Sequence, residues 1–447
     1  MIPNYTFISI SVFLACLSGI GPGLSNMPFY IIFIAFSLIY FSFYNTSRLK
    51  ARSRLNYIYI YSLFFFSLSS LFSLFYSAFP LTHPFAFDSF IVCFVWLLSI
   101  YFYHQFSLSQ LIRGIILGYF PIAIYSLFIE LPLNLAFRQA LNSFRAFLGL
   151  RLVSSYSPLG FFEESSHLPS VLILVSICSI FYLSSNDANR NHFFFIASIS
   201  NIIVFLFNFS GMMIFSIYIP LALVLSLLLI FNIVFRMKIN KQLPTLMLGF
   251  IAFISSIFFL VRDWFIAKII FVTTLTDHSS SSRFISLISG FYDFSNSCLT
   301  GCIGQFRSTR FLSAQSLSQY VDWHYPSLSI YVKNMIQFSG LDITTQSSPV
   351  YSFWGYIHSE FGFLALFFFV PWIILTIKGL RSFIDLNMSS SSTSFIRNFF
   401  NLLVYLIPLF YLLNMMIGYP RALPFAAIAL VFSLKLYPKD QTLSLEH

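Results

Sequence analysis

Two neighbouring glutamates and three nearby arginines could do chemistry together. Glu163 and Glu164 stand in a Gly-Phe-Phe-Glu-Glu-Ser-Ser segment at 160–166, just before an apolar run, and Arg138, Arg145 and Arg151 precede them. A carboxylate at the mouth of an apolar run is costly to desolvate unless it meets a cation or a wet cavity. One of two adjacent carboxylates holds its proton more tightly, which suits a general acid or base. Acidic residues are also common at helix N-termini, where they have a purely structural role. The three nearby arginines favour a functional site here.

A second set of candidates lies between residues 278 and 310. Arginine offers a fixed fork of donors to phosphate oxygens and stays charged in a low-dielectric site. Arg283 is the sharpest candidate because it follows a run of four serines and precedes a helix-like stretch. A basic loop that touches lipid headgroups is the alternative for the two later arginines. The candidates of this segment are His278, Arg283, Arg307 and Arg310, with Gly301 and Gly304 between them.

A third candidate is Glu360, in a Glu-Phe-Gly element that enters an apolar run. A buried structural hydrogen bond explains such a carboxylate as well as catalysis does. His324 and His358 are isolated histidines, and a packing or surface role is favoured for both. Cys298 and Cys302 lie four apart, where free thiols are favoured over a disulfide. No spacing in the chain resembles a metal site, and we expect no cofactor.

The amino-acid composition indicates the class of protein that carries these residues. Of the 447 residues, 58% are apolar and 9% are charged, and the mean hydropathy is +0.84. A soluble globular protein carries about 25% charged residues, so soluble, disordered and disulfide-scaffold classes are excluded. We predict an all-α, polytopic integral membrane protein. A spanning helix needs about 20 apolar residues. Twelve such runs lie near 5–21, 28–46, 56–79, 87–105, 111–130, 167–185, 192–208, 212–235, 243–261, 353–377, 395–416 and 420–436.

The basic residues set the predicted orientation. Fourteen Lys and Arg, against four acidic residues, fall in every second connection and at the C-terminus. By the positive-inside rule that side is cytoplasmic and both termini lie inside. The net charge of +10 is carried by this side, so it sets topology and gives no reason to expect nucleic-acid binding. Cys16, Cys93 and Cys178 lie inside apolar runs, where we expect small packing residues.

Two connections are long, and both are predicted outside. They cover 131–166 and 262–352 within a single transmembrane domain of residues 1–447, and long loops of ordinary composition are usually functional. We expect the second to form short helices on the membrane surface. Asn208–Gly211 is the expected hairpin between the seventh and eighth runs, and Ser389–Ser394 is expected to be a flexible connector.

The order of these features resembles the Wzy-type O-antigen polymerases and the related O-antigen ligases, which are GT-C-like membrane glycosyltransferases. The resemblance covers roughly residues 140–380. Its parts are Arg151 with Gly160–Ser166, the hairpin Asn208–Gly211, Arg283 with Gly301 and Gly304, and Glu360-Phe-Gly362. Ser165 replaces the proline of the family's Glu-Pro-Ser, and Tyr351 stands where the ligases carry a histidine, which favours the polymerase.

The resemblance implies a metal-independent reaction at the periplasmic face of a bacterial inner membrane. A growing glycan would pass from undecaprenyl diphosphate to an incoming repeat unit on the same lipid carrier. We expect Arg283 and Arg151 to stabilise the departing diphosphate, and Glu164, with Glu163 second, to accept a proton. Substrate binding is expected from Arg138, Arg145, Arg307, Arg310, His278 and Glu360. A chain-length regulator protein is the expected protein partner.

Three other functions are alternatives to the polymerase. A twelve-helix transporter normally builds its binding site from mid-membrane residues and has its longest loop inside. A lipid-linked oligosaccharide flippase lacks large outer loops. An O-antigen ligase differs from the polymerase in its acceptor and is the closest alternative.

Overall fold

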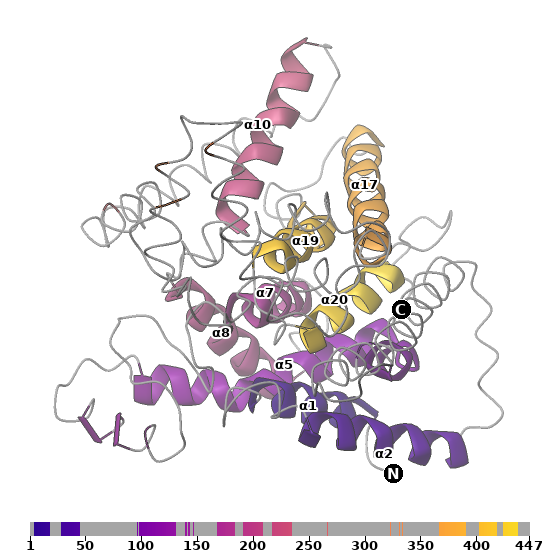
Figure 1. Cartoon of the computed structure of the whole chain (residues 1–447), viewed down its shortest axis with the longest axis vertical. Coiled ribbons are helices and arrows are strands. Elements are labelled where there is room, and N and C mark those ends of the chain that lie inside the picture. The colour runs from indigo at the N-terminus through magenta and orange to yellow at the C-terminus, as the bar shows by residue number, and fades with distance from the viewer. Residues whose placement is uncertain are drawn as a thin grey trace.

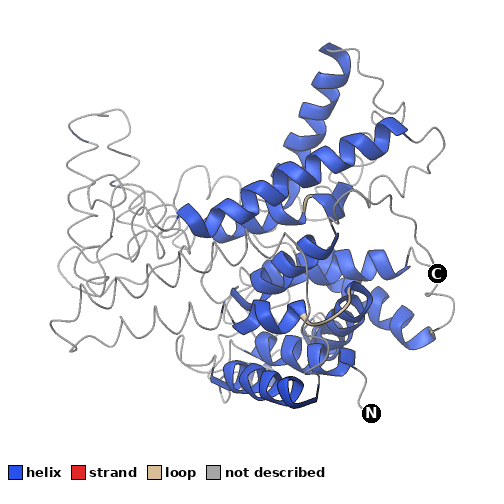
Figure 2. Ribbon diagram, turned by 90° about the vertical axis from the view of Figure 1, so that its right-hand side faces the viewer, coloured by secondary structure: helices blue, strands red, loops and turns tan. Residues whose placement is uncertain are grey.

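A computed structural model describes residues 4–17, 28–44, 98–130, 168–183, 191–208, 217–234, 366–389, 402–417 and 423–436, with residues 96, 139, 140, 142, 143, 146, 266, 322, 330 and 333. These residues form helices and the turns between them, and none of them lies in a strand (Figures 1 and 2). The prediction of an all-helical chain is therefore confirmed for this part. The ten residues predicted to act on substrate all fall outside it.

The described helices follow the predicted apolar runs. The long stretch from 192 to 235 is divided as expected, because α8 ends just before Asn208 and a separate helix begins later. The helices are α1 (Asn4–Cys16), α2 (Pro28–Tyr44), α5 (Leu108–Tyr125) with the π-helical turn η3 (Ser126–Glu130), α7 (Leu168–Leu183), α8 (His192–Leu206), α10 (Ile219–Val234), α17 (Leu366–Ser389), α19 (Ile407–Ile417) and α20 (Leu423–Leu436).

The helix α17 departs from its prediction at the C-terminal end. The apolar run was expected to end at 377, but the helix continues to Ser389. Phe383 is buried at helical spacing from the earlier core residues, so the packed face extends beyond the point where the sequence becomes polar. Ser389 is therefore the last helical residue rather than the first residue of a flexible connector.

The helix α5 lies at the centre of the described bundle. It packs against α1, α7, α8 and α20 (Figure 1). It begins with a capping box, in which the Ser107 side chain accepts from the Gln110 amide at 3.3 Å and the Gln110 side chain accepts from the Ser107 amide at 2.9 Å. Pro121 removes one internal backbone bond, and after Tyr125 the helix widens into η3.

Two glycines one turn apart bring α1 against α5. A Cβ atom at Gly114 would lie 2.4 Å from the Ile8 Cβ, and one at Gly118 would lie 2.6 Å from the Ser9 carbonyl oxygen. The backbones can approach this closely because glycine has no side chain, as in small-xxx-small helix pairs of membrane proteins. Since the earlier glycine meets the earlier part of α1, the two helices run parallel.

Buried hydroxyl groups join α1, α2 and the helical segment 98–104. The Tyr103 hydroxyl lies 2.5 Å from the Ser11 hydroxyl and 3.2 Å from the Tyr30 hydroxyl. Tyr30 also reaches the Ser99 hydroxyl, at 3.0 Å. Each partner satisfies a polar group that would be costly to bury alone. Apolar packing alone does not fix how these three segments are shifted along one another. The hydrogen-bond network does.

Two further polar side chains, Asn201 and Lys435, connect helices that are separated in the sequence. The Asn201 side-chain amide of α8 donates to the Ile116 carbonyl of α5 at 3.2 Å and to the Ser179 hydroxyl of α7 at 3.4 Å. The Lys435 ammonium of α20 donates to the His104 carbonyl at 3.0 Å, where it caps the end of a helix. These hydrogen bonds thus connect the helices both in the interior of the bundle and at one of its ends.

The predicted packing role of two cysteines is confirmed. Cys16 on α1 and Cys178 on α7 are free thiols, and both are buried among apolar residues. They act as small hydrophobic side chains at helix contacts. Cys93, Cys298 and Cys302 lie outside the described residues.

One stretch among the described residues, Leu108–Glu130, is a helix long and apolar enough to cross a membrane. Four other apolar helices among the described residues are shorter: Tyr5–Cys16, Leu168–Leu183, His192–Leu206 and Pro424–Leu436. The twelve predicted spans therefore stay a prediction. The runs at 56–79 and 243–261 lie outside the described residues.

Replacement of either glycine by alanine tests the contact between α1 and α5. Intrinsic helix propensity alone would make alanine more favourable by about 1 kcal/mol. Because the added methyl group overlaps α1, we expect Gly114→Ala and Gly118→Ala each to lower the free energy of unfolding by about 1–3 kcal/mol. The measurement is unfolding in mixed micelles followed by helical circular dichroism.

The control for this test is Ser109→Ala, on the exposed face of the same helix. It should change stability by less than about 0.5 kcal/mol. A gain of stability in the two glycine variants would show that the helices do not approach each other so closely.

Candidate functional site

The residues predicted to form the site cannot be placed relative to one another. All ten lie outside the described residues, so their convergence stays a prediction: Glu163, Glu164, Arg138, Arg145, Arg151, His278, Arg283, Arg307, Arg310 and Glu360. Described helices border the segments that carry them. η3 leads into the first predicted outer loop, α7 follows it, and α17 begins shortly after Glu360.

The end of η3 holds a buried carboxylate. Glu130 is 8% exposed, and the Ser126 hydroxyl, which is fully buried, donates to its Oε2 at 3.0 Å. The π-helical turn places these two side chains on the same face, and such turns are frequent at functional sites. A carboxyl group in this environment can take up or release a proton or hold a cation. Glu130 is therefore the described residue best suited to chemistry beside the first predicted outer loop.

Sequence reasoning missed Glu130, although a signal was present. It is the one acidic residue in the run 111–130, and an ionisable residue in such a run is by default a candidate functional residue. Because Glu130 is the last residue of this run, it was interpreted as the boundary between a predicted span and the loop that follows. The partner Ser126 could be found only by assuming a helix through Ser126–Glu130, where the two residues lie four apart.

A second group of polar side chains lies where α7, α17 and α19 meet. The Tyr411 hydroxyl of α19 donates to the Ser170 carbonyl, in the first turn of α7. The Tyr411 ring stacks on Trp372 of α17, with ring centroids 5.8 Å apart. The Trp372 indole nitrogen is buried, and no residue of the described part accepts a hydrogen bond from it. These contacts fix α7 and α17 at the points where they join the segments of the predicted site.

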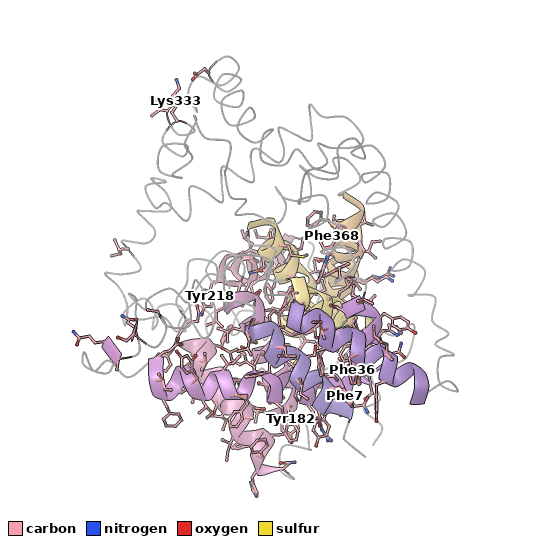
Figure 3. All side chains as sticks on the ribbon, turned by 60° about the horizontal axis from the view of Figure 1, so that its bottom comes forward. Phe7, Phe36, Tyr182, Tyr218, Lys333 and Phe368 are labelled. Atoms are coloured by element: carbon pink, nitrogen blue, oxygen red, sulfur yellow. The ribbon has the colours of Figure 1, made fainter. Side chains whose placement is uncertain are left out.

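The second predicted outer loop is described at a few positions. Residues 322, 330 and 333 are helical, and the Lys333 ammonium lies 2.9 Å from the Asp322 carboxylate. Figure 3 shows Lys333 at the edge of the molecule, apart from the labelled aromatic residues of the bundle. The Lys333 and Asp322 side chains are 57% and 35% exposed, so this ion pair contributes little to stability.

The described residues contain no group of three or more His, Cys, Asp or Glu side chains placed to hold a metal ion. The predicted metal independence of the reaction is not decided by this observation. The carboxylate of Glu130 with its hydroxyl donor is an acid–base arrangement, and it lacks the further ligands that a metal would need among its described neighbours.

Comparison with known proteins gives no match. No family model matches the chain, no curated protein is significantly similar to its sequence, and no solved structure is significantly similar to its fold.

Removal of the Ser126 hydroxyl tests whether Glu130 depends on it. Ser126→Ala takes a donor away from a buried carboxylate, and leaving such a group underbonded costs about 1–3 kcal/mol. We expect the free energy of unfolding to fall by that amount at neutral pH. Ser143→Ala is the matched control, because its hydroxyl also bonds within one helical turn but is exposed. Equal stability of the two variants would contradict the buried contact.

Proposed function

We propose that this chain is a polytopic membrane protein that joins lipid-linked oligosaccharides into a polysaccharide. The membrane part of the proposal is supported by the outward faces of its helices. Rows of large apolar side chains at helical spacing are exposed on α2, α10 and α17, with Phe36 at 66% and Ile377 at 61%. Contiguous apolar surface of this kind is unfavourable in water and favourable against lipid. The rows are Ile32, Phe36 and Ile39, then Leu223, Leu227 and Ile230, then Val370, Ile373 and Ile377.

The predicted orientation is supported by which helix ends meet. Lys435 and His104 are both predicted at cytoplasmic ends, and they are hydrogen bonded. Tyr411 and Ser170 are both predicted near periplasmic ends, and they are hydrogen bonded as well. Helices that cross a membrane in alternating directions must bring same-side ends together, and these pairs agree with that requirement.

The contacts of α1 add support, and one contact of α2 departs from the pattern. α1 and α5 are both predicted to run outward, and their glycine contact makes them parallel. Tyr30, at the predicted outer end of α2, bonds Tyr103 near the predicted inner end of its own run. Tyr103 also forms a hydrogen bond with Ser11, in the middle of α1. These buried contacts shift α2 along α1, away from the position that it would have in a simple antiparallel hairpin of the two helices.

The single observation that carries the enzymatic proposal is the order of four sequence elements on the predicted periplasmic side. Arg151 with Glu163 and Glu164 comes first, then the hairpin after α8, then Arg283 with its glycines, and then Glu360 before α17. This order resembles that of the Wzy-type polymerases. The exposed apolar rows offer surfaces along which a polyprenyl tail can lie.

The proposed reaction transfers a glycan between two lipid carriers. A hydroxyl oxygen at the non-reducing end of the incoming unit attacks the anomeric carbon of the growing chain. A carbon–oxygen bond forms there, the bond to the lipid diphosphate breaks, and the hydroxyl proton passes to Glu164. Arg151 and Arg283 stabilise the charge that develops on the departing diphosphate. Fixed guanidinium groups can do this without a metal ion.

Loss of Glu164 or Arg283 tests the proposal. We expect Glu164→Gln and Arg283→Ala each to slow chain elongation by about 10²–10⁴-fold, because each removes a group that acts in the transition state. The measurement is the length distribution of the surface polysaccharide in a strain complemented with each variant. Recovery of the protein in alkali-washed membranes shows that insertion is unchanged.

Lys333→Gln is the control for this test, because it removes a cation from the same predicted loop outside the proposed site. It should leave the polymer at normal length. Normal polymer from Glu164→Gln or Arg283→Ala would remove that residue from the mechanism. In a deletion strain, single repeat units on the surface glycolipid support a polymerase, whereas their complete absence supports a ligase.

A further inference from the structure

The helices α7 and α8 pack side by side and run in opposite directions. Phe194, near the start of α8, contacts Tyr182, near the end of α7, with ring centroids 5.5 Å apart. Asn201, two turns further along α8, reaches Ser179, which lies earlier in α7. The part of α8 between Phe194 and Asn201 therefore lies level with the part of α7 between Ser179 and Tyr182.

Ser198 lies in this part of α8, on its α7 side. It precedes Asn201 by one turn and is about 60° from it around the helix. Phe193, which contacts Phe120 of α5, is about 80° from Asn201 in the other direction. Ser198 is therefore on the side of Asn201 that faces away from α5 and toward α7.

Three fully buried side chains at this level keep unused hydrogen-bonding capacity. The Asn201 side-chain nitrogen donates to the Ile116 carbonyl and to the Ser179 hydroxyl, which fixes the orientation of the amide. Within the described part of the chain, no donor reaches the Asn201 Oδ1, and the Ser198 hydroxyl has no partner. The Ser179 hydroxyl accepts from Asn201, and its own proton has no acceptor among the same residues. Burial of such groups without partners is costly.

Other buried hydroxyls avoid this cost within their own helix. Ser176, Thr376 and Ser433 each donate to the carbonyl one turn earlier. Ser198 does not, although the Phe194 carbonyl has the same position relative to it. The Ser198 hydroxyl is thus left for a partner outside its own helix.

We propose that Ser179, Ser198 and Asn201 bind one internal water molecule between α7 and α8. The water donates to the Asn201 Oδ1 and to the Ser198 Oγ, and it accepts from the Ser179 hydroxyl. Three hydrogen bonds are the usual number for a buried water. Side chains one turn apart on a helix, with Cβ atoms about 5–6 Å from each other, are within reach of one bridging molecule. The proposal depends neither on membrane insertion nor on the glycan-joining reaction.

A neutral ligand fits this site better than a cation does. A sodium ion would meet the same oxygen atoms, but its charge would have no counter-charge. The sequence of α7 contains no charged residue, α8 contributes His192 at its exposed start, and α5 contributes Arg113, which is itself a cation. Burial of an unpaired ion is far more costly than burial of a water that makes three hydrogen bonds.

A double-mutant cycle on the full-length chain tests whether the two serines share a water. Ser198→Ala removes one hydrogen bond of the water and should raise the equilibrium constant for unfolding about 2–10-fold. Ser179→Ala should raise it as well, and each substitution should cost less in the presence of the other. Because the two serines form no direct hydrogen bond, a coupling of about twofold or more reports the shared water. Unfolding is measured in mixed micelles.

The control pair for the cycle is Ser198→Ala with Ser109→Ala. Ser109 is exposed on α5, so it reports the intrinsic effect of exchanging serine for alanine in a helix. The two substitutions should be additive.

A direct readout is the transfer of polarisation from water to asparagine side chains, measured by solid-state NMR on the 15N-labelled chain in lipid bilayers. The Asn201 signal is identified by its loss in Asn201→Leu. It should receive polarisation from water in the wild-type chain and lose most of it in Ser198→Ala. The exposed Asn191 is the reference and should not change.

Four results would overturn the proposal. A lower unfolding constant in Ser198→Ala would mean that this hydroxyl is simply unpaired. Additive effects of the two serines, or no transfer from water to Asn201 in the wild-type chain, would exclude a shared water. Stability should be unchanged when choline replaces sodium at constant ionic strength, and a loss of stability on this replacement would assign the site to the cation.

Discussion

The described arrangement depends on how closely α1 can approach α5. At Gly114 and Gly118 the backbone of one helix lies directly against the other, so that no additional carbon atom fits. Each pair of atoms contributes little, but the many backbone contacts that this close approach allows add up to a large van der Waals attraction between the two helices. With α1 held there, the other sides of α5 are left to α7, α8 and α20.

Apolar packing alone would leave these helices free to slide, and a few polar side chains set their register. A hydrogen bond is directional, and a buried polar group without a partner is costly. Asn201 therefore ties α8 to both α5 and α7, and Tyr411 ties α19 to the first turn of α7. Because most neighbouring residues are apolar, each such bond determines more of the geometry than it would in a polar protein.

Helix positions followed from the sequence because helix formation is local. The run 192–208 became His192–Leu206, and the run 167–185 became Leu168–Leu183. Two features did not follow. α17 continues beyond its apolar window because one buried face is enough to hold a helix, and Tyr103 meets Ser11 across 92 positions, a pairing that no local pattern encodes. The candidate residues of the predicted site came from the sequence alone. Glu130 was recognised as a further candidate only from its burial in the structure.

The bond from Lys435 to His104 has a consequence for biosynthesis. It joins residues 331 positions apart in the chain. At about 5–20 residues per second, a ribosome needs roughly 15–65 s to make the intervening polypeptide. During that interval α5 has been made, but the surface that later receives α20 is open. The apolar surface of the early helices must therefore be protected from aggregation in another way until α20 has been made and covers it.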